Sequence, residues 1–188
     1  MRLLRALACV SMLVACSRKT TNTVAPDPAP SVSSAPPIDR LPADTTITLE
    51  RGRCFGPCPS YRVSLFADGR VAFESLGGSY PHEGDAALVP DAGAATIDAS
   101  AVLALMNRIR AAGFFDMADD YPTHWTDKRT MIVTVTIDGK TKSIRDEGGP
   151  DEELHDHPPE VPRALRDVEA DIDRVANVGR WIGAPPAD

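Results

Sequence analysis

The sequence lacks the local motifs that mark the common enzyme classes. It has no glycine-rich loop for cradling phosphates, no nucleophile elbow, no internal repeat and no second long apolar helix after its first residues. Ser79, Ser100 and Ser143 carry no signature of an activated nucleophile. The sequence therefore favours a non-catalytic role over an enzyme and indicates no cofactor.

Basic residues are also scarce. Lys and Arg number 20 against 27 Asp and Glu, which gives a formal net charge of -7, and removing Arg2 and Arg5 with a leader lowers it to -9. An acidic protein is repelled by nucleic-acid phosphates and by anionic lipid surfaces. This balance predicts that nucleic acid is not a partner.

The first residues have the layout of a secretory signal. Arg2 and Arg5 precede a short apolar run over residues 6–14, which is too short to span a bilayer. Leu13-Val14-Ala15-Cys16 resembles the lipobox of bacterial lipoproteins. The resemblance implies that residues 1–15 are removed and that Cys16 is acylated, which makes the lipid bilayer a partner; an ordinary secreted protein with an unmodified Cys16 is the alternative.

The residue after Cys16 indicates the compartment. Ser17 after the lipidated position favours the outer membrane of the bacterial cell envelope, by resemblance to enterobacterial sorting.

Residues 16–44 are rich in Pro, Ser, Thr and Ala, a composition that cannot bury enough surface to fold, so we expect a disordered tether. We expect a single domain over residues 45–182 and a disordered tail over 183–188.

Cys54 and Cys58 are the two cysteines left after processing. Cys9 is discarded with the leader and Cys16 is acylated, so in an oxidising space the remaining pair favours a structural disulfide. Thiol–disulfide redox chemistry is an alternative, although three intervening residues and a following strand differ from the thioredoxin-like pattern. Metal binding is less favoured, because two sulfurs half fill a tetrahedral site.

The apolar pattern predicts an α+β fold, with an antiparallel sheet built from two hairpins plus a leading strand and two helices on one face. Strands are expected over 45–50, 61–66, 70–75, 131–137 and 140–145, with a short strand over 86–89 and a loop over 121–130. A three-residue turn at Gly69 pairs Val63 with Phe73, and a two-residue turn at Asp138-Gly139 pairs Val133 with Ile144. Helices are expected over 99–112, capped by Asp98, and from Pro162 to Gly179.

The chain resembles an uncharacterised family of bacterial envelope domains that are often lipidated. The resemblance covers most of residues 45–182, and its most specific part is Arg51 followed by Cys54-Phe55-Gly56-x-Cys58-Pro59-x-Tyr61. It continues through these further positions: Asp68-Gly69, Gly113-Phe114-Phe115, Tyr121, Thr126-Asp127, Asp138-Gly139 and Trp181. The resemblance implies a domain boundary and a fold, with no reaction attached.

Two sets of residues are candidate sites. Arg51, Phe55, Tyr61 and Asp127 lie nearest the cysteine loop and form a candidate surface for an envelope protein or a cell-wall component, with sheet packing or loop bracing as the alternative role. His155 and His157 are candidate metal ligands, but adjacent ligands in a loop are poorly preorganised and a solvated acidic loop is favoured.

Overall fold

The computed structural model describes residues 36–54, 58–77, 90–123, 128–148 and 161–183. The chain divides into two compact units, Met1–Ser31 and Val32–Asp188, and every described residue belongs to the second unit. The predicted leader, the strand over 86–89 and the tail after residue 183 lie outside the described residues.

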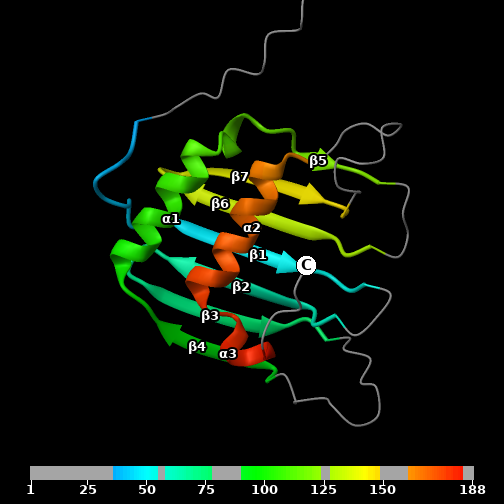
Figure 1. Cartoon of the computed structure of the whole chain (residues 1–188). Helices are drawn as coiled ribbons and strands as arrows, with labels where there is room; N and C mark the ends of the chain where they lie inside the picture. Colours follow the sequence, from blue (N-terminus) through cyan, green and yellow to red (C-terminus); the bar gives the residue numbers. More distant parts are fainter. Residues whose placement is uncertain (1–35, 55–57, 78–89, 124–127, 149–160, 184–188) are drawn as a thin grey trace, which may run out of the picture. The chain divides into compact units, whose positions relative to one another are not determined.

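Seven strands form one sheet in the order β4-β3-β2-β1-β6-β7-β5 (Figure 1). All neighbours pair antiparallel except β5, which runs parallel to β7. The leading strand β1 therefore lies between the two predicted hairpins and joins them. The bounds are β1 Thr46–Arg51, β2 Tyr61–Phe66, β3 Arg70–Ser75, β4 Ala92–Thr96, β5 Asp120–Tyr121, β6 Met131–Ile137 and β7 Lys140–Asp146.

Both hairpins have the predicted registers. In the first, Val63 pairs with Phe73, and Gly69 has a φ of 85°, a left-handed conformation that glycine adopts without a steric penalty. In the second, Val133 pairs with Ile144, and both turn residues have positive φ. A register with apolar residues opposite one another places one side of each strand in the core.

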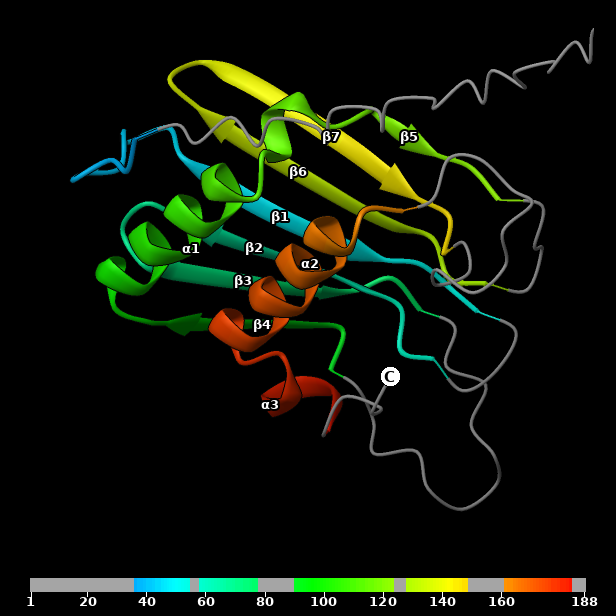
Figure 2. The same ribbon diagram turned by 45° about the horizontal axis from the view of Figure 1, so that its top comes forward.

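Two helices cover one face of this sheet, α1 (Ala99–Ala111) and α2 (Arg163–Ala176) (Figure 2). Both bury an apolar stripe. On α2, Ala176 completes the stripe, whereas Val175 is only partly buried. The fold is thus α+β, as the sequence predicts. The buried stripes are Val102, Leu105, Met106 and Ile109 on α1, and Leu165, Val168 and Ile172 on α2.

The helix ends differ in part from the prediction. Asp98 occupies the N-cap position of α1, but its side chain makes no capping hydrogen bond; its carbonyl accepts one from the Ala101 amide at 2.9 Å. The last helix ends at Ala176 instead of Gly179, because Asn177 adopts a left-handed conformation with φ 50°. Gly179 instead begins a short helix, α3 (Gly179–Ile182).

Trp181 on α3 packs back on the sheet. Its ring stacks on Phe73 with the centroids 4.9 Å apart, and Phe73 stacks in turn on Tyr61 at 5.6 Å. At the end of α1, Phe114 is fully buried in the 3-10 turn η1 (Phe114–Asp116), whereas Phe115 is 37% exposed. Of these two adjacent phenylalanines, only Phe114 therefore enters the core.

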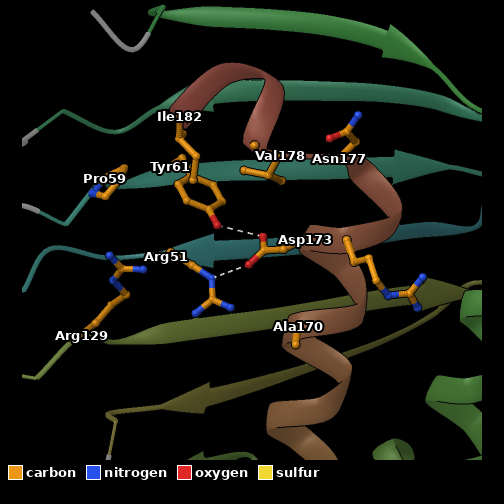
Figure 3. Close-up of a pocket in the computed structure, with 11 residues that line it drawn as sticks. Arg51, Pro59, Tyr61, Arg129, Ala170, Asp173, Asn177, Val178 and Ile182 are labelled. Carbon is orange, nitrogen blue, oxygen red and sulfur yellow. Dashed lines mark hydrogen bonds and ion pairs between the residues drawn. The ribbon is translucent and has the colours of Figure 1, made fainter. Parts of the chain in front are cut away.

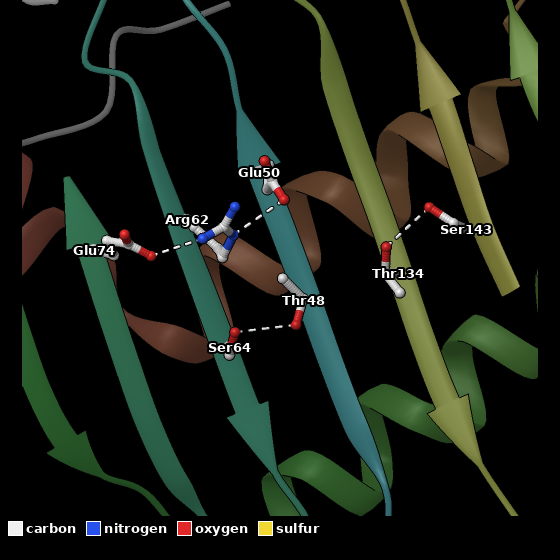
Figure 4. A network of polar contacts seen from close by, with 7 residues as sticks. All are labelled: Thr48, Glu50, Arg62, Ser64, Glu74, Thr134 and Ser143. Carbon is white, nitrogen blue, oxygen red and sulfur yellow. Dashed lines mark hydrogen bonds and ion pairs between the residues drawn. The ribbon is translucent and has the colours of Figure 1, made fainter. Parts of the chain in front are cut away.

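The opposite face of the sheet is polar. Arg62 on β2 donates to Glu50 on β1 and to Glu74 on β3, and hydroxyl pairs cross neighbouring strands at Thr48–Ser64 and Thr134–Ser143 (Figure 4). Alternation between a buried and a polar side is typical of an antiparallel sheet covered on one face.

The chain before β1 contacts α1. Asn107 on α1 accepts a hydrogen bond from the Ile38 amide at 2.8 Å and donates one to the Ile38 carbonyl at 3.0 Å. Ile38 and Leu41 pack against the core. Ordered contacts thus begin inside the segment that the composition assigns to the tether.

Candidate functional site

A pocket of about 330 Å³ opens where β1 ends, β2 begins and α2 meets α3 (Figure 3). Most of its described wall comes from the C-terminal half of α2, from α3 and from the turn between them, and the rest from the ends of β1 and β2 and the residues shortly before β2 and β6. The lining residues are Arg51, Pro59, Tyr61, Arg129, Ala170, Asp173, Arg174, Asn177, Val178, Gly179 and Ile182.

The periodicity of the strands and of α2 explains why polar side chains meet here. Arg51 follows Ile47 and Leu49 on the core side of β1, and Tyr61 is its register partner on β2. Asp173 lies one residue after the buried Ile172 and four residues after the buried Glu169, so it shares the inward side of α2. A charged group at the margin of a core needs a partner.

Arg51 and Tyr61 both donate hydrogen bonds to Asp173. Arg51 Nε donates to Asp173 Oδ2 at 2.8 Å, and the Tyr61 hydroxyl donates to Asp173 Oδ1 at 2.8 Å (Figure 3). The Arg51 and Asp173 side chains are only 13% and 15% exposed. The three residues therefore form a nearly buried polar triad that joins β1, β2 and α2.

Burial determines the protonation behaviour of the triad. It raises the pKa of Tyr61 far above its ordinary value, and the negative charge of Asp173 adds to that rise. It also raises the pKa of Asp173, although Arg51 and the Tyr61 hydroxyl favour the charged carboxylate. Tyr61 thus acts as a neutral hydrogen-bond donor at neutral pH, which does not suit it to act as a base or nucleophile.

A second buried carboxyl lies one helical turn away. Glu169 is 3% exposed, and its Oε1 has no hydrogen-bond partner among the described residues. Burial, together with the nearby Asp146, raises the pKa of Glu169 to about 8. Asp146 is fully buried and accepts a hydrogen bond from the Gly148 amide at 2.6 Å. Glu169 is therefore mostly uncharged at neutral pH.

Cys54 and Cys58 form a disulfide bond, with their Cα atoms 5.8 Å apart. The bond closes the connection from β1 to β2, and Pro59, next to Cys58, belongs to the pocket wall. The clipped loop therefore begins three residues after Arg51 and ends three residues before Tyr61.

Two of the four residues predicted as a binding surface come together here. Arg51 and Tyr61 both line the pocket. Phe55 and Asp127 lie outside the described residues, as do Cys16, His155 and His157. Within the described ranges, no three His, Cys, Asp or Glu side chains come together as a group that could hold a metal ion.

Asp173 and Arg129 are the site residues that the sequence analysis missed. One signal for Asp173 was present, namely an acidic residue beside the apolar stripe of an amphipathic helix. Arg129 precedes β6, and its charge acts on both Asp173 and Tyr61. No local motif marks it.

The fold and site define a disulfide-clipped α+β domain with a small pocket at its last helices, in which a polar triad meets apolar side chains. The chain belongs to a family described as "Domain of unknown function (DUF6438)", whose model matches residues 45–176. The match begins one residue before β1 and ends with α2. No curated protein matches the chain. None of the described helices has both the length and the apolar character needed to cross a membrane.

Proposed function

We propose that this chain is a lipid-anchored lipoprotein of the bacterial cell envelope whose domain binds an envelope protein or a cell-wall component through the pocket beside the Cys54–Cys58 disulfide. The observation that carries the binding role is the pocket itself, because it brings Arg51 and Tyr61 together next to the disulfide. Concave sites with a few convergent polar groups are the usual ligand sites of proteins.

The anchor rests on the leader. An apolar run after Arg2 and Arg5 ends in the lipobox-like Leu13-Val14-Ala15-Cys16. Two or three acyl chains hold a protein stably on a membrane, whereas one chain binds only marginally. A disulfide bond between Cys54 and Cys58 is in keeping with an oxidising compartment outside the cytosol. Ser17 favours the outer membrane.

The anchor is tested by intact mass spectrometry of the full chain purified from membranes. The expected species lacks residues 1–15 and carries acyl chains on Cys16. Cys16→Ala should abolish the added mass, and Cys9→Ala should leave the mature protein unchanged, since Cys9 leaves with the leader. An unmodified Cys16 in membrane-purified protein would overturn the lipoprotein assignment.

The binding role is tested by crosslinking in the native envelope. Arg51→Ala and Phe55→Ala are expected to lose a captured partner that the unaltered chain retains. Arg70→Ala is the matched control, because Arg70 is an exposed arginine paired with Asp68 away from the pocket. Identical partners in all variants would show that this loop is not the binding face.

A further inference from the structure

Arg51 has further N–H donors in the pocket besides the Nε group that bonds to Asp173. Its Nε is engaged by Asp173, and the structure gives its two Nη groups no acceptor among the described residues. A guanidinium carries five N–H donors in a planar fork that matches a carboxylate. Since the side chain is 13% exposed, water competes poorly for those donors. This part of the wall is therefore suited to accept an oxyanion.

The charges around the pocket favour the same ligand. Among the described lining residues, three are arginines, Arg51, Arg129 and Arg174, and one is acidic, Asp173. Arg174 is paired with Asp171 and is mostly exposed. The charge of Arg129 acts on Tyr61 and Asp173, so Arg51 is the arginine on which the ligand argument rests (Figure 3). Both Asp173 oxygens are already occupied, which leaves little to attract a cation. Among the described lining residues, arginines thus outnumber acidic residues three to one in a chain whose net charge is -7.

Part of the remaining wall is apolar. Pro59, Val178 and Ile182 lie around the Tyr61 ring, and Ala170 lines the pocket from α2 beyond Asp173 (Figure 3). A volume of about 330 Å³ is at the lower end of the range for small-ligand pockets. A pocket of this size accommodates a ligand with an anionic head and a short, largely apolar tail. It is too small for a large polyanion.

We infer that the pocket binds the carboxylate end of a short peptide, with the carboxylate on the Nη groups of Arg51 and one or two small side chains against Val178 and Ile182. Arg–carboxylate pairs are frequently bidentate and stronger than neutral hydrogen bonds. The inference deepens the proposed function by naming the ligand class, and it rests on that proposal only in placing the peptide in the envelope.

The test uses the full chain in detergent and isothermal titration with acetyl-alanyl-alanine. Its C-terminal amide is the matched probe, since it has the same shape without the charge. The carboxylate is expected to bind saturably and the amide at least tenfold more weakly. Equal binding of the two probes would overturn the inference. Inorganic phosphate distinguishes a second source of oxyanion: if it binds as tightly as the dipeptide, the peptide assignment fails.

Two variants locate the site. Arg51→Gln should weaken dipeptide binding at least tenfold. Ala170→Phe should do the same by filling the pocket, and it leaves the Arg51–Asp173–Tyr61 contacts in place, so it covers the case in which Arg51→Gln unfolds. Ala104→Phe, at an exposed alanine of α1, is the control and should bind normally. Unchanged binding by Ala170→Phe would overturn the inference. The mass of Cys16 in the same preparation tests the lipid anchor separately.

Discussion

Tyr61 donates a hydrogen bond to Asp173 across 2.8 Å, and the two residues are 112 positions apart in the chain. The bond ties the first residue of β2 to the last helical turns of α2. Because Asp173 also holds Arg51 on β1, one carboxylate fixes the helix to two adjacent strands. The pocket lies between these attachment points, so its shape depends on the triad.

Replacing Tyr61 with Phe should lower the free energy of unfolding by about 2 kcal/mol, since hydrogen bonds to charged groups contribute roughly 1.5–3 kcal/mol. The phenylalanine keeps the ring that stacks on Phe73, and only the hydroxyl is lost. Urea unfolding followed by circular dichroism measures the change.

Tyr121→Phe is the matched control for this substitution. The Tyr121 hydroxyl accepts a hydrogen bond from the Ala118 amide at 3.2 Å, so no charge is left without a partner when it is removed. Its loss should cost about 1 kcal/mol or less. If both variants lost the same stability, Asp173 would not depend on Tyr61 as the contacts indicate.

Glu169 should make the protein less stable as the pH rises from about 5 to about 8. Its ordinary pKa is 4.5, and burial followed by the charge of Asp146 raises the pKa to about 8 in the fold. In that window the folded state holds a proton that the unfolded state has released, so stability falls with increasing pH. Each pKa unit corresponds to about 1.4 kcal/mol, so the full loss is on the order of a few kcal/mol.

Glu169→Gln should remove this dependence. The charged groups acting on Glu169 are Asp146, Arg51, Arg166 and Asp173. The variant is expected to match the unaltered protein near pH 5 and to exceed it near pH 8, by thermal unfolding across the series. Glu74→Gln, on the polar face of the sheet, is the control for the change from Glu to Gln. A Glu169→Gln profile that still falls with pH would place the titrating group elsewhere.

The hairpins could be predicted from sequence because their determinants are local. A turn at Gly69 or at Asp138-Gly139 and the need to pair apolar residues together select one register. β4 could not be predicted in the same way, since Ala92–Thr96 has no β-branched or aromatic run. β4 forms because it pairs with the outer edge of β3 and because Trp181 packs on Gly93. Both are tertiary contacts.

The site was only partly visible for a similar reason. Arg51 and Tyr61 stood out because they flank the cysteine pair. Asp173 is one of several charged residues on an amphipathic helix, and such residues are normally solvated. Only the docking of α2 across β1 and β2 brings its carboxylate onto Arg51 and Tyr61.

Removing the disulfide with Cys54→Ser and Cys58→Ser should cost only about 2 kcal/mol in the chain-entropy model, because the closed loop is short. Urea unfolding of the double variant measures this. The reduction potential of the unaltered chain against glutathione should lie below about -300 mV, as for a structural bond. A potential near that of the thiol–disulfide exchange proteins would favour a redox role instead.

Gly93 on β4 should be intolerant of any side chain while Trp181 is present. A Cβ atom at this position would lie 2.2 Å from Trp181 Nε1 and 2.7 Å from Trp181 Cε2, far inside van der Waals contact. Overpacking of this kind typically costs about 1–3 kcal/mol. Gly93→Ala should therefore destabilise the domain by that amount in urea unfolding.

The clash at Gly93 comes from the Trp181 indole, so removing the indole should reduce the loss of stability caused by Gly93→Ala. In a Trp181→Leu background, Gly93→Ala should cost little, and the double-mutant cycle should give a coupling energy of about 1 kcal/mol or more. Trp181→Leu alone loses the stacking on Phe73 and is the reference for the cycle. If the effects of the two substitutions on stability were additive, α3 would not pack on β4 through this pair. Other contacts would then have to hold Ile182, which follows Trp181 in α3, in the pocket wall.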